Sequence, residues 1–137
     1  MENQIPPCFY RVSIKAMILN DKREFLLIQE ANKLWELPGG GMDFGENAEQ
    51  ALRREISEEM GLEVQEIAAQ PSYFFSCLNP KGQHIVNVVY TASLRNLDFV
   101  PSDECMALGY FDPNTILQQS QHMYPNVLAF ARMLKEK

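Results

Sequence analysis

The sequence predicts an α/β domain in which a mixed β-sheet carries helices on both faces. Segments with β character occur through most of the chain, whereas residues 47–60 and 125–136 have helical periodicity. The chain has 137 residues, the length of one ordinary domain, so we expect a single domain over residues 1–137. Hydrophobic residues make up 46% and charged residues 22%, which favours a folded core over disorder.

The expected strands follow from alternation and turn signals. Residues 11–18 alternate around Val12, Ile14 and Ala16, and the turn signal at residues 20–22 predicts a hairpin with residues 25–29. The segment Trp35-Glu36-Leu37-Pro38 is a short extended piece that runs into three glycines. The remaining expected elements are one or two strands within residues 63–78, strands at 84–94 and 109–111, and one helical turn at 116–119.

The segment at residues 47–60 is the clearest helix because both of its ends are marked. Asn47 is a suitable N-cap, and Gln50 three residues later completes a motif close to a capping box. Gly61 follows the last helical residue, where a glycine commonly ends a helix. The apolar face that we expect to pack on the sheet consists of Ala48, Ala51, Leu52 and Ile56.

Three carboxylates interrupt the amphipathic pattern of this helix. Glu55 and Glu59 continue along the apolar face and Glu58 borders it, at spacings that make the three side chains neighbours. Like charges are crowded there, and the C-terminal half of a helix disfavours anions. A bound divalent cation would relieve both penalties, since Mg²⁺ takes oxygen ligands. The alternative is a solvated acidic helix end that pairs with Arg53 and Arg54.

The residues before the helix favour the cation. Gly40 is followed after five residues by Glu46, and after seven more by the run Arg54-Glu55-Ile56-Ser57-Glu58-Glu59-Met60-Gly61-Leu62. This pattern resembles the Nudix box at every position, including the bulky aliphatic residues Ile56 and Leu62. The Trp35–Gly40 lead-in, the element order and the length also resemble a minimal Nudix domain of MutT type.

The resemblance implies the Nudix α/β/α sandwich, with the box as a loop–helix–loop. It also implies a hydrolase that cleaves a pyrophosphate bond in a nucleoside diphosphate linked to another moiety, by water attack on phosphorus with Mg²⁺ or Mn²⁺. Metal ions must bridge an acidic cluster and an anionic substrate, and they polarise the phosphoryl oxygens. The length of the chain favours nucleoside triphosphates or similarly small substrates.

The resemblance also assigns roles to the residues of the box. The implied metal ligands are Glu55, Glu58, Glu59 and the Gly40 carbonyl. Arg54 and Glu46 are expected to pair and to hold the loop against the helix, so that the carboxylates stay oriented. The catalytic group therefore comprises Glu58, Glu55, Arg54 and Glu46, and which carboxylate acts as general base stays open.

Residues outside the box are weaker candidates. Glu104 precedes the aromatic strand at 109–111, as in the late loop of the family, and is a candidate metal ligand or base, with Asp103 as its substitute. An acidic loop in solvent is the alternative. Arg11 is a candidate phosphate contact or a surface residue. Within the aromatic run that starts at Tyr73, Phe74 and Phe75 are candidates for stacking on a base, with sheet core as the alternative.

Charge and targeting signals narrow the partners and the location. The net charge of −6 argues against duplex nucleic acid and an anionic membrane surface. It does not argue against a small phosphorylated nucleotide bound through a metal ion. No apolar stretch approaches a membrane span, and Met1–Gln4 lacks the start of a signal peptide. We expect a cytoplasmic monomer or homodimer in which all three cysteines are reduced.

Two functions other than hydrolysis are alternatives for a chain with this resemblance. A non-catalytic Nudix-fold ligand sensor is one alternative, although such modules typically have degraded boxes and this box is complete. A prenyl-diphosphate isomerase on the same fold is the other, with Cys77 as the conceivable functional thiol.

Overall fold

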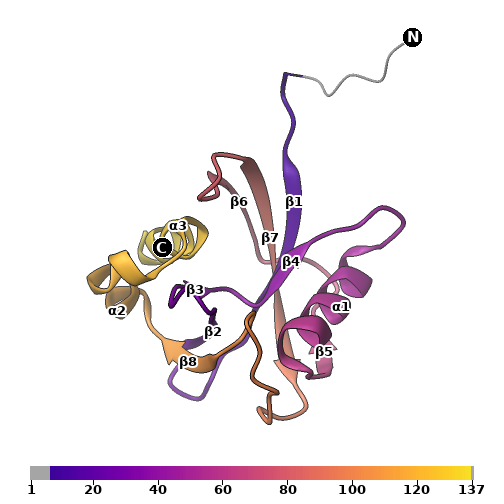
Figure 1. Cartoon of the computed structure of the whole chain (residues 1–137), viewed down its shortest axis with the longest axis vertical. Coiled ribbons are helices and arrows are strands. Elements are labelled where there is room, and N and C mark those ends of the chain that lie inside the picture. Colours follow the sequence, from indigo (N-terminus) through magenta and orange to yellow (C-terminus); the bar gives the residue numbers. More distant parts are fainter. Residues whose placement is uncertain (1–6, 137) are drawn as a thin grey trace.

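The computed structural model describes residues 7–136 and contains two sheets and three α-helices (Figure 1). The larger sheet has the order β4-β1-β7-β5, and β6 also pairs with β7. Its strands are β1 (Arg11–Met17), β4 (Gly39–Gly41), β5 (Val64–Ile67), β6 (Tyr73–Leu78) and β7 (His84–Leu94). The smaller sheet has the order β3-β2-β8, with β2 (Phe25–Gln29), β3 (Trp35–Glu36) and β8 (Ala107–Phe111).

The helices lie on both sides of the larger sheet. Figure 1 shows α1 (Ala48–Met60) on one side of β1, β4 and β7, and α2 (Pro113–Gln118) and α3 (Pro125–Lys135) on the other. A short 3₁₀ turn, Ser120–His122, connects α2 to α3. This arrangement confirms the expected α/β fold with a mixed sheet, because β1 and β7 are parallel and all other strand pairs are antiparallel. Within residues 7–136, no helix is long and apolar enough to cross a membrane.

The expected hairpin between the first two strands is wrong beyond its base. Leu19 and Phe25 form an isolated antiparallel bridge, after which the two strands separate into different sheets. The reason is that both edges of β1 are already occupied. One edge pairs with β4 through Ile14 and Gly40, and the other pairs with β7 over the whole length of β1. Strand β2 therefore pairs with β3 and β8 instead.

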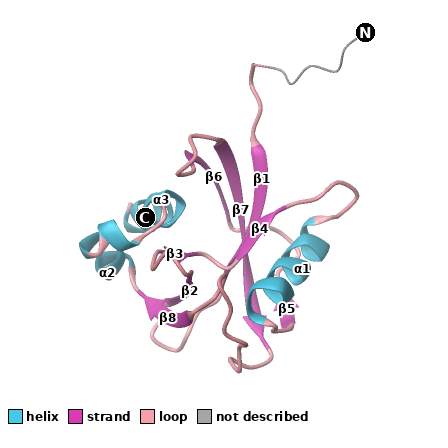
Figure 2. Ribbon diagram, in the orientation of Figure 1, coloured by secondary structure: helices cyan, strands magenta, loops and turns pink. Residues whose placement is uncertain are grey.

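Helix α1 begins and ends where its capping residues predict. The Asn47 side chain accepts a hydrogen bond from the Gln50 backbone N–H at 2.8 Å, and the Gln50 side chain accepts one from the Asn47 N–H at 2.9 Å. Gly61 adopts the left-handed conformation (φ 67°) and donates its N–H to the Ser57 carbonyl. These caps fix the register of the helix. Figure 2 shows the loop from β4 leading directly into α1, which is the loop–helix–loop arrangement expected for the box.

Two apolar cores hold the layers together. On the α1 side, Ala51, Leu52 and Ile56 pack against Ile14 and Ala16 of β1. On the α3 side, the fully buried Phe130 is the centre of an aromatic cluster, with ring centroids 5.2 Å from Phe25, 5.3 Å from Tyr73 and 6.0 Å from Phe75.

We expect Phe130→Ala to lower the free energy of unfolding by about 3–5 kcal/mol, because it removes a buried ring that three others contact. Urea denaturation measures the change. Phe74→Ala is the matched control, since Phe74 is 70% exposed, and should cost less than about 1 kcal/mol. Equal losses for the two variants would contradict this description of the core.

Candidate active site

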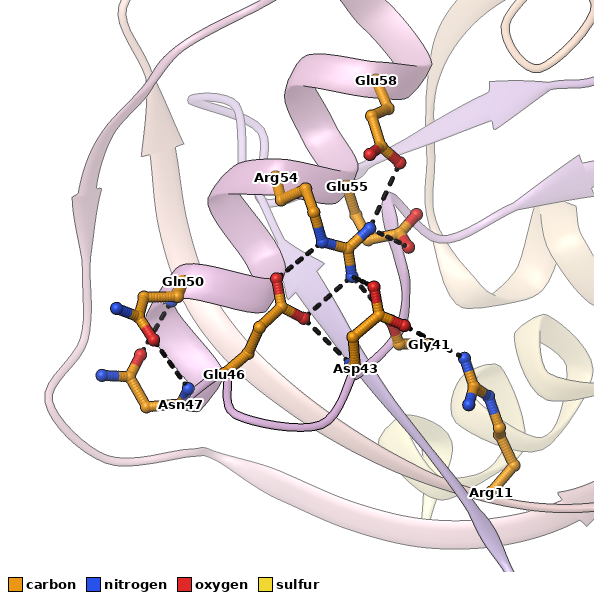
Figure 3. Close-up of polar contacts among 9 residues, drawn as sticks. All are labelled: Arg11, Gly41, Asp43, Glu46, Asn47, Gln50, Arg54, Glu55 and Glu58. Carbon is orange, nitrogen blue, oxygen red and sulfur yellow. Dashed lines mark hydrogen bonds and ion pairs between the residues drawn. The ribbon is translucent and has the colours of Figure 1, made fainter.

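Arg54 is the centre of the polar contacts between α1 and the loop that precedes it (Figure 3). Its guanidinium pairs with both carboxylate oxygens of Glu46, at 2.6 Å from Nε and 2.9 Å from Nη2. Nη2 also donates to the Gly41 carbonyl at 3.0 Å, while Nη1 donates to Glu55 at 3.0 Å and to Glu58 at 3.2 Å. One side chain therefore joins the β4 strand, the following loop and two carboxylates of the helix.

The loop between β4 and α1 is held by the same charges. Glu46 accepts a further hydrogen bond from the Asp43 backbone N–H at 2.9 Å, and Arg54 together with this N–H lowers the pKa of Glu46 to about 2. The Asp43 carboxylate lies 3.4 Å from Arg54 and 3.8 Å from Arg11. The Arg11 side chain is about half exposed at 52%, at the outer end of this network.

Glu59 differs from the other two glutamates because it is buried. Glu59 is 7% exposed, and its Oε1 accepts a hydrogen bond from the Gly39 backbone N–H at 3.0 Å. Burial raises the pKa of Glu59 to about 8, although the positive charge of Lys15 and the Gly39 N–H oppose the shift. Without a bound cation, this carboxyl group is therefore mostly protonated at neutral pH.

The glycines of β4 allow the backbone to lie directly against these carboxylates. A Cβ atom on Gly40 would lie 2.5 Å from Glu55 Oε2, closer than real Cβ contacts. A Cβ on Gly39, whose φ is 114°, would lie 2.1 Å from the Ile14 carbonyl oxygen. A side chain at Gly39 would displace β4 from β1, and one at Gly40 would displace the Glu55 carboxylate.

The donor set fits a hard divalent cation. Glu55, Glu58 and Glu59 supply carboxylate oxygens, and the Glu55 carboxylate lies directly against the Gly40 backbone. Arg54 contacts one oxygen each of Glu55 and Glu58, which leaves the second oxygen of each side chain for another ligand. Among the described residues, no group of three carboxylate, histidine or cysteine side chains already forms a metal cluster. A cation would therefore draw together side chains that Arg54 now orients.

The candidates outside the box lie in different places. Glu104 is exposed, and its N–H donates to Ser102 Oγ, which in turn donates to the Glu59 carbonyl at 3.3 Å. The loop that carries Glu104 and Asp103 is thus tied to the end of α1. Phe74 is exposed on β6, whereas Phe75 stacks on Phe130 in the core.

A cavity of about 460 Å³ lies on the α3 side of the sheet, where sequence reasoning placed no site. Its walls include four largely buried polar residues, which are Lys15, Glu36, Asn87 and Asn126. Glu36 accepts hydrogen bonds from Asn126 at 2.6 Å and from the Leu37 N–H at 2.8 Å, and burial raises its pKa despite these bonds and the nearby Lys15. In the sequence, the feature that indicates this polar wall is Lys15, which interrupts the apolar pattern of residues 11–18.

Cys77 also lines the cavity, but its environment disfavours a reactive thiolate. Asn87 Nδ2 lies 3.6 Å from its sulfur, and burial raises the pKa of the thiol above its ordinary value. Neither Phe74 nor Phe75 is among the residues that line the cavity.

Known proteins match most of this chain in sequence and in fold. The sequence pattern of the NUDIX domain matches residues 9–130. An RNA pyrophosphohydrolase from Orientia tsutsugamushi (strain Boryong) is 26% identical over 145 residues, covering 96% of this chain and 87% of that protein. An RNA pyrophosphohydrolase from Ruthia magnifica subsp. Calyptogena magnifica is 43% identical over 60 residues, or 43% of this chain, and the match spans only 34% of that relative.

A solved structure has the same fold. The crystal structure of the MutT NUDIX hydrolase from Burkholderia pseudomallei aligns with a TM-score of 0.64 and 31% identity, covering 77% of this chain and 85% of that one. Because the domain match spans most of the sequence, the chain belongs to the Nudix hydrolase family. The resemblance inferred from the box is thereby confirmed.

Glu59 should lower the stability of the metal-free protein as pH rises. Between its ordinary pKa of 4.5 and about 8, Glu59 is protonated in the folded state and ionised in the unfolded chain. The unfolded state then binds fewer protons, so the free energy of unfolding falls with increasing pH. In EDTA, we expect Glu59→Gln to be more stable than wild type at pH 8 by about 2–4 kcal/mol. The reason is that a difference of one between the pKa values of the folded and unfolded states corresponds to about 1.4 kcal/mol.

Urea denaturation at pH 5 and pH 8 tests this expectation, and the advantage of Glu59→Gln should shrink towards pH 5. Glu63→Gln is the control, because the Glu63 side chain is 76% exposed and pairs with Arg95 at the surface. A Glu59→Gln variant with the same stability as wild type at both pH values would show that Glu59 is not held neutral.

Proposed function

We propose that this Nudix hydrolase is a divalent-metal-dependent pyrophosphohydrolase that cleaves a nucleoside diphosphate linked to another moiety. The observation that carries the proposal is that Glu59 accepts the Gly39 N–H and Glu55 lies against the Gly40 backbone, while Arg54 orients Glu55 and Glu58. Glu55, Glu58, Glu59 and the Gly40 carbonyl would hold Mg²⁺ or Mn²⁺. When bound, such a cation polarises phosphoryl oxygens and offsets the charge repulsion between the glutamates and the substrate.

The protein residues would divide the remaining tasks. Arg54 and Glu46 hold the β4–α1 loop in place, so that the carboxylates keep their orientation. Glu58 has the most exposed side chain of the three glutamates, at 55%, so it is the one that bulk water reaches most readily. We assign Glu58 the acceptance of a proton from the attacking water, with Glu55 as the alternative base. We propose Glu104 as a further metal ligand or base, because the Ser102 hydrogen bonds tie its loop to the end of α1.

The substrate that we favour is a nucleoside triphosphate or a nucleotide of similar size. The 460 Å³ cavity lies within the range of small-molecule sites, and its polar walls suit a group that forms hydrogen bonds. Both curated relatives described above are named RNA pyrophosphohydrolases, so an RNA with a 5′-terminal pyrophosphate linkage is a second substrate to test.

We expect Mg²⁺-dependent release of a monophosphate or pyrophosphate product from at least one compound in a substrate panel. The panel comprises nucleoside triphosphates with their oxidised forms, ADP-ribose, dinucleoside polyphosphates, reduced dinucleotide cofactors and 5′-triphosphorylated RNA. EDTA should abolish turnover, and Mg²⁺ or Mn²⁺ should restore it. Ligand binding without hydrolysis across the whole panel would instead favour a sensor.

Glu58→Gln and Glu59→Gln should each lower kcat by at least about 100-fold, because each removes a charge that would bind the cation or accept the proton. Steady-state kinetics at saturating Mg²⁺ measure the effect, and circular dichroism verifies the fold. Glu49→Gln is the matched control on the same helix, since the Glu49 contact found in the structure is a surface pair with Arg53. Wild-type rates for either active-site variant would overturn the assignment.

A further inference from the structure

Lys15 is an unusual residue for its position in the sheet. It lies in the middle of β1 between the buried residues Ile14 and Ala16, and is itself only 5% exposed. Ile14 and Ala16 face α1, so the alternation of the strand directs Lys15 to the opposite face. Burial of an ammonium group is costly unless it is paired and hydrogen-bonded, so its contacts indicate what compensates the cost.

The Lys15 ammonium is bonded to the backbone that leads into β4. Nζ donates to the Gly39 carbonyl at 2.9 Å and to the Leu37 carbonyl at 3.3 Å. The carbonyl between them, that of Pro38, accepts the Ala16 backbone N–H at 2.9 Å. Three successive carbonyls are therefore fixed by two neighbouring residues of β1.

The same segment contacts the glutamate cluster from its other side. The Gly39 N–H donates to Glu59 Oε1 at 3.0 Å, and the Gly40 backbone lies against the Glu55 carboxylate. Gly39 is thus held between Lys15, through its carbonyl, and Glu59, through its N–H. A shift of Gly39 would move the backbone on which Glu55 and Glu59 rest.

We infer that Lys15 is a positioning residue that holds the Leu37–Gly39 backbone in register with Glu59 and thereby orients the candidate metal-binding glutamates. This inference rests on the proposed function for its link to turnover. Within the described residues, the hydrogen bonds and ion pair of Lys15 go to Leu37, Gly39 and Glu36, so it acts through the backbone.

A competing explanation is that Lys15 only neutralises Glu36. The two charges lie 3.8 Å apart in the wall of the cavity. That distance is longer than either hydrogen bond from Lys15 Nζ to a backbone carbonyl, which favours the backbone as the main partner of Lys15. The two explanations differ in what happens when Glu36 is made neutral. Pure charge compensation predicts that Lys15 is then dispensable, whereas positioning predicts that it is still required.

Lys15→Met tests the inference because it keeps the length of the side chain and removes its donors. We expect kcat to fall by about 10- to 100-fold with KM changed by less than about threefold, as for a misplaced catalytic group. The same factor should appear when Lys15→Met is introduced into Glu36→Gln, and Lys15→Arg should retain more of kcat than Lys15→Met. By NMR, the Gly39 amide should exchange with solvent at least about tenfold faster in Lys15→Met, while distant core amides are unchanged.

Four results would overturn the inference. These are an unchanged kcat, a rise in KM alone, a loss of kcat that disappears in the Glu36→Gln background, and unchanged exchange at Gly39. Absence of turnover by the wild-type protein on every substrate would refute the proposed function instead. The Gly39 exchange measurement would still test the positioning role in that case.

Discussion

The paired contacts of the Arg54 guanidinium are the interaction on which the geometry of the acidic cluster depends. Helix α1 has no basic residue in its last turn, so nothing within that turn balances the three glutamates of its C-terminal half. Arg54 donates hydrogen bonds to two of them, Glu55 and Glu58, and at the same time binds Glu46 and the Gly41 carbonyl. One residue with a planar, multidentate side chain thus joins the carboxylates of the helix and the loop to the backbone of β4.

The third glutamate is accommodated differently. Glu59 is buried, and its pKa is raised to about 8, so the folded protein without a cation keeps it largely neutral. The cluster therefore combines two carboxylates that pair with an arginine and one whose pKa is raised by burial. A divalent cation would favour the ionised form of Glu59, so metal binding and proton release are expected to be coupled. The arrangement costs stability in the absence of metal, as is common where function sets the placement of charge.

The polar wall of the cavity and the glutamate cluster meet at the same short segment of chain. Strand β1 separates the two regions, because its alternate residues face the α1 core on one side and the cavity on the other. The Leu37–Gly39 backbone lies at the edge of β1 and contacts Lys15 on one face and Glu59 on the other. A group bound in the cavity would therefore lie one strand away from the residues proposed to bind metal.

Most secondary elements and the whole box were predictable from the sequence because their determinants are local. The caps Asn47 and Gly61 mark the ends of α1, and the spacing of the glutamates follows from the helical repeat. The hairpin prediction failed because local turn chemistry carries no information about which strand already occupies an edge. Strand β1 pairs with β4 and with β7, and its partner residues on β7 lie 74 positions further along the chain, from Arg11 and Ile85 to Met17 and Thr91.

By itself, the sequence determined the family pattern and the acidic helix face, since both depend on residue types at fixed short spacings. The resemblance to the family implied the pairing of Arg54 with Glu46. The helical repeat placed Glu59 on the apolar face and Glu58 at its border, but only the tertiary structure decided that Glu59 is bonded to the Gly39 N–H. It also decided that Lys15 reaches the carbonyls on both sides of Pro38. It also brought Lys15, Glu36, Asn87 and Asn126 together around one cavity from four separate elements. Burial and long-range contacts arise from the packing of β1, β3, β7 and α3, which no local pattern encodes.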